Sequence, residues 1–231
     1  MNISRRTAMV TGASFCALML AGCDNSGGAA NAENQTPVAA NDHTSPTTDI
    51  TRTGDLNKPI GFADRWLGDE NAKVTVIEYA SPTCPHCATF HTQIFPDFKK
   101  EFIDSGKVRF VMRPFSRSIL DAVVFMVAAC DDPAADYYKL TSAYFDTMRS
   151  WAIAEDAKSE MAKVAINNGF TQESFEACLT NQELFQGLEK VRTQALDEFG
   201  LDATPTFFVN GKKLSGVISV EEFAKEIDPL L

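Results

Sequence analysis

The four residues Cys84-Pro85-His86-Cys87 have the types and spacing needed for thiol chemistry. Two cysteines separated by two residues can form a disulfide and exchange it with the thiols of another protein. The β-branched and aromatic run at 74–80 predicts a buried strand, and the stretch 84–102 predicts a helix. We therefore expect Cys84 at a helix N-terminus, where free N–H groups and the helix dipole lower its pKa and make it the nucleophile.

We expect His86 and Cys87 to have different chemical roles in the motif. His86 adds a hydrogen-bond donor or a positive charge beside the Cys84 sulfur, which lowers that pKa further and makes the disulfide oxidising. Cys87, one turn into the helix, is the partner that attacks a mixed disulfide and releases the substrate. The motif thus predicts an exposed, acidic Cys84 and a buried Cys87, with Pro85 between them in the redox centre.

A zinc site or a structural disulfide would also use two such cysteines, but both are weaker interpretations. Cys84, Cys87 and His91 lie on one helix face and could bind zinc, but a fourth ligand is missing. Neither Cys130 nor Cys178 has a second Cys or a His beside it. A purely structural disulfide would close too small a ring to remove much chain entropy. We therefore predict no metal site.

A second constellation is Thr204-Pro205, just before an expected β-hairpin at 206–215. A proline before a strand can be a simple turn or edge device. A cis Pro205 would instead leave the Thr204 carbonyl and its neighbouring backbone free to hold an extended substrate near Cys84. We therefore take Thr204 and Pro205 as candidate substrate-binding residues.

The six cysteines are too few in 231 residues for a disulfide-dense framework, so each must be explained separately. Cys130 and Cys178 fall in expected helices. We predict that they form a structural disulfide, and the alternative is a pair of buried free thiols.

The elements around these residues indicate an α/β fold. A strand at 108–113 completes a βαβ unit with the strand and helix that flank Cys84. An all-helical insertion follows at about 118–199, and the chain ends with the hairpin and a helix that Ser219 and Glu222 begin as a capping box. The expected helices of the insertion are 119–130, 134–148, 157–168, 174–179 and 184–199.

The N-terminal residues have the pattern of a targeting signal. Arg5 and Arg6 precede a mostly apolar run at 7–20 that is too short to span a bilayer. The run ends in Leu20-Ala21-Gly22-Cys23, which resembles a bacterial lipobox, so residues 1–23 are expected to be a signal with Cys23 as the lipidated first mature residue. The alternative is an ordinary signal peptide cut near Ala21. The two arginines also hint at twin-arginine export.

The next stretch, 24–58, has too few apolar residues to fold and is predicted to be a flexible polar linker before a domain at 59–231. Its polarity argues against an obligate dimer interface, so we expect a monomer. The net charge of −10 argues against a nucleic-acid partner, because phosphate binding needs clustered Lys and Arg.

The Cys-Pro-His-Cys motif, the helical insertion between βαβ and ββα halves, and Thr204-Pro205 together resemble the DsbA-like thiol oxidases of the thioredoxin superfamily. The resemblance covers about residues 61–231. It implies that Glu78, six residues before Cys84, is a buried acid and a candidate for proton transfer, although an acid at a strand edge would look the same. A Thr before the cis proline is similar to the isomerase branch.

What the resemblance implies about function is an expectation at this point. Such proteins oxidise reduced, unfolded exported proteins in the periplasm of Gram-negative bacteria, and a membrane quinone-linked partner reoxidises them. The redox equivalents are carried on Cys84 and Cys87, so no bound cofactor is expected. An Asp24 after a lipidated Cys23 is compatible with retention at the inner membrane. The alternatives are a disulfide isomerase or reductase of the same superfamily and a periplasmic metal carrier.

Overall fold

The structure is a computed structural model that describes residues 54–231. The predicted signal segment, the lipidation of Cys23 and most of the predicted linker lie outside the described residues. Among the described helices, none is both long enough and apolar enough to cross a bilayer.

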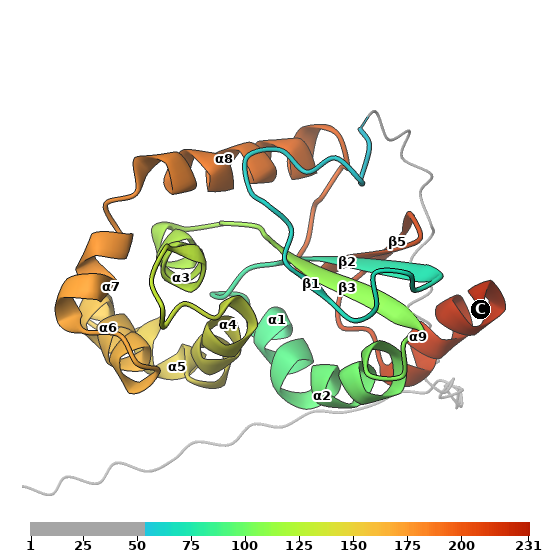
Figure 1. The fold of residues 1–231 in the computed structure, drawn as a ribbon, viewed down its shortest axis with the longest axis horizontal. Coiled ribbons are helices and arrows are strands. Elements are labelled where there is room, and N and C mark those ends of the chain that lie inside the picture. The colour runs from blue at the N-terminus through green and yellow to red at the C-terminus, as the bar shows by residue number, and fades with distance from the viewer. Residues whose placement is uncertain (1–53) are drawn as a thin grey trace, which may run out of the picture. The chain divides into compact units, whose positions relative to one another are not determined.

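A five-stranded mixed sheet forms the centre of the domain (Figure 1). β2 (Val74–Ala80) runs parallel to β3 (Val108–Pro114) and antiparallel to β4 (Thr206–Val209), as the βαβ and ββα halves require. β5 (Lys212–Ser215) pairs with β4 across the hairpin, and β1 (Trp66–Leu67) pairs with β3. The expected strands are confirmed. β1 was not predicted, because two residues are too few to show an alternating pattern.

The helical stretch after β2 is continuous but irregular. It consists of α1 (Pro85–Thr89), the π-helical turn η1 (Phe90–Ile94), α2 (Phe95–Phe98) and a second π-helical turn, η2 (Lys99–Ile103). Pro96 in α2 has no N–H to donate to a carbonyl of the preceding turn, and the π-helical turn stands just before it. The predicted helical stretch from Cys84 to about Phe102 is confirmed, since Cys84 caps α1 and η2 ends at Ile103.

The helical insertion is also confirmed. Its longer helices begin where the sequence supplies an N-cap, such as Ser118 before the first and Asn181 before the last. The stretch expected as one helix at 134–148 is divided at Thr147 and starts later, after the cap Asp136. The helices are α3 (Ile119–Ala129), α4 (Tyr137–Asp146), α5 (Met148–Trp151), α6 (Ala157–Asn167), α7 (Gln172–Cys178) and α8 (Gln182–Asp197).

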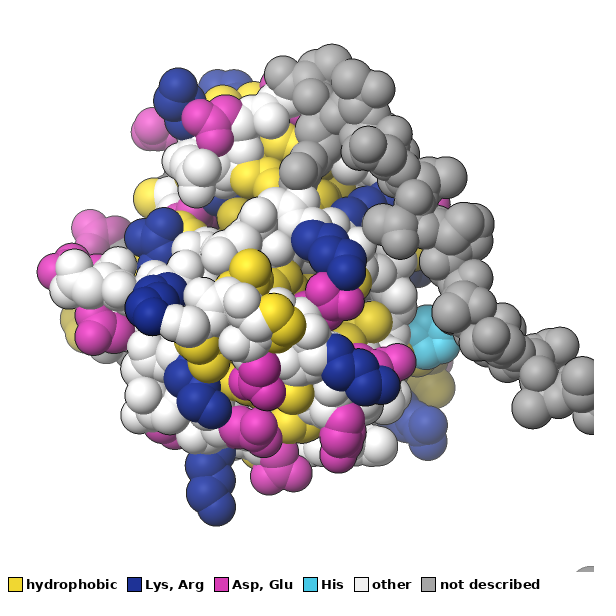
Figure 2. Space-filling model, turned by 90° about the vertical axis from the view of Figure 1, so that its right-hand side faces the viewer, with side chains coloured by type: hydrophobic (Ala, Val, Ile, Leu, Met, Phe, Trp, Pro, Cys, Tyr) yellow, Lys and Arg dark blue, Asp and Glu magenta, His cyan; other side chains and the backbone are white. Residues whose placement is uncertain are grey.

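Helices cover both faces of the sheet (Figure 1). On one face the α1–η2 stretch and α9 (Val220–Ile227) bury a cluster of phenylalanines, in which the rings of Phe90 and Phe207 lie 4.8 Å apart and those of Phe98 and Phe223 lie 4.7 Å apart. On the other face lies α8. A short 3₁₀ turn, η3 (Asp228–Leu230), ends the chain. On the side of the molecule seen in Figure 2, charged side chains interrupt the exposed apolar ones.

The domain begins earlier than predicted. Residues 54–58, which we expected in the flexible linker, contact the fold: Leu56 packs against the core and its carbonyl accepts a 2.7 Å hydrogen bond from Arg113 Nη2. The buried guanidinium of Arg113 also pairs with Asp64 at 2.7 Å. A buried cation needs such partners. The segment was predicted to be a linker because it is polar, but its backbone supplies one of these partners.

Candidate active site

Cys84 stands at the junction that the sequence predicted. It is the N-cap of α1 in extended conformation, directly after the turn that ends β2, and Pro85 is the first helical residue. Cys84 and Cys87 are both free thiols, and both are buried. The expectation of an exposed Cys84 was therefore wrong, since only 3% of its surface is accessible.

The loop around Pro205 accounts for that burial. The Thr204–Pro205 peptide bond is cis, as predicted. It places the Thr204 carbonyl 3.2 Å from the Cys84 Sγ, which donates to it. On the other side of the loop, Arg117 Nη1 donates to the Thr204 hydroxyl at 3.3 Å. The two predicted constellations, far apart in sequence, thus meet at the Cys84 sulfur.

The two thiols of the motif have opposite acidities. The pKa of Cys84 is lowered from 9.0 to about 5, chiefly by a hydrogen bond from the Cys87 thiol, and burial opposes this. The backbone N–H groups of Cys87 and His86 lower it further. Burial raises the pKa of Cys87 well above its ordinary value, and the charge of Glu78 adds to the rise. Cys84 can therefore exist as a thiolate at neutral pH while Cys87 stays protonated.

His86 acts differently from our expectation. Its contribution to the acidity of Cys84 comes from its backbone N–H at the start of the helix. The side chain is exposed. The Cys87 thiol, the Thr204 side chain and the backbone N–H groups at the helix N-terminus therefore lower the pKa of Cys84. The imidazole of His86 lies at the surface.

Asp121 is a buried residue of the site that sequence reasoning missed. Its Oδ1 accepts from Thr83 N at 2.7 Å and from Ser81 Oγ at 3.0 Å, and its Oδ2 accepts from the backbone N–H groups of Arg117 and Ser118 at 2.8 and 3.0 Å. It also completes a capping box with Ser118 at the start of α3. The Ser-x-x-Asp spacing signals the cap, but nothing in the sequence links it to the loop before Cys84.

Glu78 is buried beneath the motif, as the family resemblance implied. The side chain is fully inaccessible, on β2 between Met112 of β3 and Phe207 of β4. The Nε2 of His91 lies 2.9 Å from its Oε2 and 3.1 Å from its Oε1. The histidine that might have joined the two cysteines at zinc is therefore bound to Glu78. Within residues 54–231, no three His, Cys, Asp or Glu side chains gather as a metal site would require.

An open groove of about 530 Å³ runs beside the motif. The first helical residue, Pro85, lies at one end, and Gln93 of η1 lines it further along. Its opposite wall is the α4–α5 corner, with Phe145 and Met148. The groove gives this side of the α1–η1 stretch direct access to solvent.

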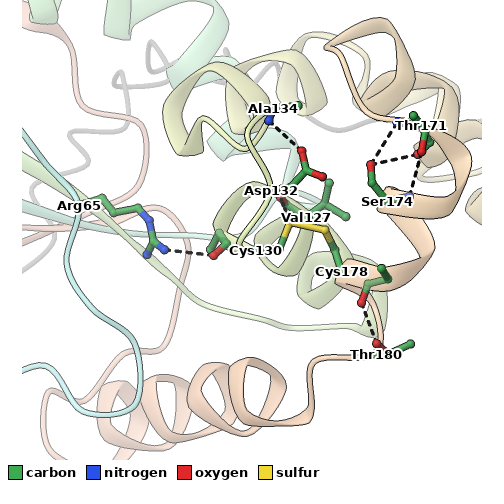
Figure 3. Close-up of a disulfide and its surroundings, with 11 residues drawn as sticks. Arg65, Val127, Cys130, Asp132, Ala134, Thr171, Ser174, Cys178 and Thr180 are labelled. Atoms are coloured by element: carbon green, nitrogen blue, oxygen red, sulfur yellow. Dashed lines mark hydrogen bonds between the residues drawn. A yellow bond between two sulfur atoms is a disulfide. The ribbon is translucent and has the colours of Figure 1, made fainter.

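The predicted disulfide between Cys130 and Cys178 is present (Figure 3). It joins the residue that ends α3 to the last residue of α7, across a sequence separation of 48. Next to it, Arg65 donates through Nη2 to the carbonyl of Ala129 at 3.3 Å. This second pair of cysteines therefore joins two helices of the insertion.

Comparison with known proteins agrees with this geometry. The family model described as Thioredoxin matches residues 62–229. A putative protein-disulfide oxidoreductase of Rickettsia conorii is 30% identical over 168 residues, which are 73% of this chain and 60% of the relative. The chain therefore spans about three fifths of that relative's length. Disulfide bond formation protein D of Bacillus subtilis is 29% identical over 169 residues, 70% of this chain and 74% of the relative.

Among solved structures, alpha-DsbA1 of Wolbachia pipientis is similar in both sequence and fold. It is 28% identical, with a TM-score of 0.67, over 72% of this chain and 90% of that protein.

Proposed function

Because this chain belongs to the thioredoxin family and, within it, to the DsbA-like thiol-disulfide oxidoreductases, we propose that it oxidises the thiols of exported proteins through Cys84 and Cys87. The observation that carries the proposal is the acidity of Cys84. Its pKa is lowered to about 5, so the reduced enzyme retains a stable thiolate, and a stabilised thiolate makes the disulfide a strong oxidant.

The exchange follows from the geometry. A thiolate of the substrate attacks the Cys84 sulfur of the oxidised enzyme, a bond forms between the two, and the Cys84–Cys87 bond breaks. The Cys87 sulfur leaves as a thiolate and takes up a proton, because burial disfavours its charged form. A second substrate thiolate then attacks the substrate sulfur of the mixed disulfide, and Cys84 departs as the better leaving group.

The cis-Pro loop supports binding of an extended substrate. The backbone of Thr204 faces the Cys84 sulfur, and a peptide held there in extended conformation could pair with the loop as an added strand. The substrate class we propose is a reduced, unfolded polypeptide. A membrane quinone-linked protein would reoxidise Cys84 and Cys87, and the sulfurs carry the electrons without a bound cofactor.

A disulfide isomerase is the second candidate, because Thr204 before the cis proline is similar to that branch. To separate the two, the oxidised protein is incubated with a reduced unfolded substrate, and the reduced protein with a scrambled one. We expect rapid oxidation of the first, little rescue of the second, and a monomeric mass in solution. Efficient rescue together with a dimeric mass would overturn the oxidase assignment.

We also propose that the protein acts in the periplasm, anchored by lipid on Cys23 to the inner membrane of a Gram-negative bacterium. The support is the sequence Leu20-Ala21-Gly22-Cys23 with Asp24 after it. In fractionated cells, the unaltered protein should be in the inner membrane and Cys23→Ala in the soluble periplasm. Cys16→Ala, in the same segment, is the matched control and should stay membrane-bound. An unaltered protein found soluble would contradict the anchor.

A further inference from the structure

Glu78 is fully buried, so any proton that it exchanges with solvent must pass through a neighbouring group. If the proposed oxidation holds, Cys87 takes up one proton when substrate is oxidised and gives it up when the enzyme is reoxidised. Besides burial, the charge of the ionised Glu78 carboxylate, together with that of Cys84, raises the pKa of Cys87, but none of the Glu78 surface reaches solvent. A fully buried carboxylate can exchange protons with water only through another group that titrates.

His91 is bound to that carboxylate and is the more exposed of the two. Its Nε2 lies 2.9 Å from Glu78 Oε2, and 6% of the side-chain surface is accessible, against 0% for Glu78. It is one helical turn beyond Cys87, so the two side chains lie on the same side of the helical stretch. The imidazole is therefore next to both Glu78 and the helix face that carries Cys87.

The second ring nitrogen of His91 reaches solvent. No described residue forms a hydrogen bond with Nδ1, since every hydrogen bond of this ring is made by Nε2. Within residues 54–231, Ser116 Oγ is the single polar side-chain atom that is both fully buried and without a partner. Nδ1 is thus at least partly accessible. A histidine with one nitrogen on a buried carboxylate and the other on water has the arrangement of a proton shuttle.

Phe145 fixes the orientation of this ring. Its ring stacks on the imidazole with centroids 4.3 Å apart and planes at 6°. Phe145 also lines the open groove beside Pro85. The stack keeps the imidazole parallel to the Phe145 ring while its Nε2 contacts Glu78.

The remaining titratable groups near Glu78 do not compete for this part. Tyr137 and Tyr138 of α4 are the other groups on which its charge acts, and burial raises the pKa of both. Their hydroxyls donate to backbone carbonyls, that of Tyr137 to Met112 and that of Tyr138 to Arg65. They stay protonated at neutral pH, which leaves His91 as the side chain on Glu78 that has one ring nitrogen to donate a proton and one to accept it.

We propose that His91 carries protons between Glu78 and solvent, so that Cys87 can be protonated and deprotonated in each cycle. When Cys87 leaves the disulfide as a thiolate, Glu78 supplies its proton and is reprotonated through His91. When Cys87 attacks the mixed disulfide that Cys84 forms during reoxidation, the Cys84–Cys87 bond forms, the partner sulfur leaves as a thiolate, and the Cys87 proton departs by the same route.

The test isolates the step that involves Cys87. The reduced protein is mixed with oxidised glutathione, quenched with acid at short times, and analysed by mass for the Cys84–glutathione adduct and for the Cys84–Cys87 disulfide. In His91→Gln, which keeps a hydrogen-bond donor for Glu78 but cannot shuttle protons, we expect unchanged adduct formation and disulfide closure slowed about a hundredfold at pH 7. Gln93→Ala, which alters the same π-helical turn without touching Glu78, should close at the unaltered rate.

A chemical rescue distinguishes a shuttle from a structural residue. Adding imidazole to His91→Ala should restore closure in proportion to the imidazole concentration and with the pH profile of free imidazole, an outcome that a packing defect would not produce. Closure at the unaltered rate in His91→Gln from pH 5 to 9 would overturn the proposal. An unaltered protein that formed no adduct with glutathione would instead overturn the proposed function from which this inference starts.

Discussion

The domain contains two pairs of cysteines, and the difference between them is electrostatic. Cys84 caps the N-terminus of a helix, and its pKa is lowered to about 5. Cys130 ends α3 and Cys178 is the last residue of α7. The N-terminal end of a helix stabilises a thiolate and the C-terminal end disfavours one. The position at a helix N-terminus therefore suits Cys84 to thiol–disulfide exchange, and the positions at helix C-termini suit Cys130 and Cys178 to a lasting cross-link.

The largest expected effect follows from removing the acidic sulfur. Cys84→Ala should lower thiol oxidation of an unfolded substrate at least about a thousandfold, because no other described cysteine has a lowered pKa. Cys87→Ala cannot hold the active-site disulfide and should be similarly inactive with reduced substrate. With oxidised glutathione it should instead accumulate the Cys84–glutathione mixed disulfide, visible by mass under non-reducing conditions, because no Cys87 sulfur is present to attack it. The double variant Cys130→Ala/Cys178→Ala is the control and should oxidise substrate normally. If it were the inactive variant, the assignment of the two pairs would be reversed.

The Cys130–Cys178 disulfide should contribute more to the folding stability of the domain than the Cys84–Cys87 pair does. Losing the Cys130–Cys178 disulfide should cost about 4 kcal/mol of unfolding free energy by the chain-entropy model, because the bond closes a loop with a sequence separation of 48. Denaturant unfolding of Cys130→Ala/Cys178→Ala measures this. The thiolate of Cys84, followed by ultraviolet absorbance in the same variant, should still titrate near 5. A loss below 1 kcal/mol would show that helix packing alone holds the insertion.

Acid should destabilise the reduced enzyme more than the oxidised one. The pKa of Cys84 is about 5 in the folded protein against 9.0 ordinarily, so the stabilisation is complete above the unfolded value and is lost as pH falls through 5. Between pH 4 and 7 the stability of the reduced form should rise by about 3 kcal/mol relative to the oxidised form. Cys87 adds nothing in this window, because its raised pKa keeps it protonated in the folded state and the unfolded thiol is protonated there too.

Denaturation of both redox forms at pH 4, 5, 6 and 7 measures that difference. The reduced Cys84→Ser variant is the control and should lose the relative rise. Parallel curves for the two redox forms of the unaltered protein would contradict an acidic Cys84.

Local patterns predicted most of the fold, since strands β2 and β3 and the order of the helices follow periodicity and caps. The hairpin turn is another example: Asn210 and Gly211 adopt φ values of 42° and 90°, as the Asn-Gly pair suggests. The burial of Cys84 was not predictable in this way. It depends on the distance between Cys84 and Thr204, which are 120 residues apart in sequence.

Two site residues were missed or misplaced for the same reason. His91 looked like a partner of the cysteines because they share a helix face, but in the fold it faces a strand residue, Glu78. Asp121 was not singled out at all, because its spacing from Ser118 is that of an ordinary helix cap, yet it binds the loop that enters the motif. Spacing along one helix is local information, and the choice between neighbours across elements is made by the tertiary fold.

Helix α3 extends from one cysteine region to the other, yet we expect the two regions to be energetically independent. At its start Asp121 accepts from Thr83 N, next to Cys84, and Cys130 stands at its end. Asp121→Asn should cost about 2 kcal/mol, because one oxygen becomes a donor facing buried N–H groups. Asp136→Asn, at the exposed cap of α4, should change stability by less than about 0.5 kcal/mol, since Asn caps as well as Asp.

The decisive comparison combines Asp121→Asn with Cys130→Ala/Cys178→Ala. Sites without shared contacts lose stability additively to within about 0.5 kcal/mol, and we expect that result in denaturant unfolding, with a combined loss of about 6 kcal/mol from the values above. A combined loss that departs from the sum by more than about 1 kcal/mol would show that α3 couples the cross-link to the loop before Cys84. In that case the insertion would influence the redox centre as well as stabilise the fold.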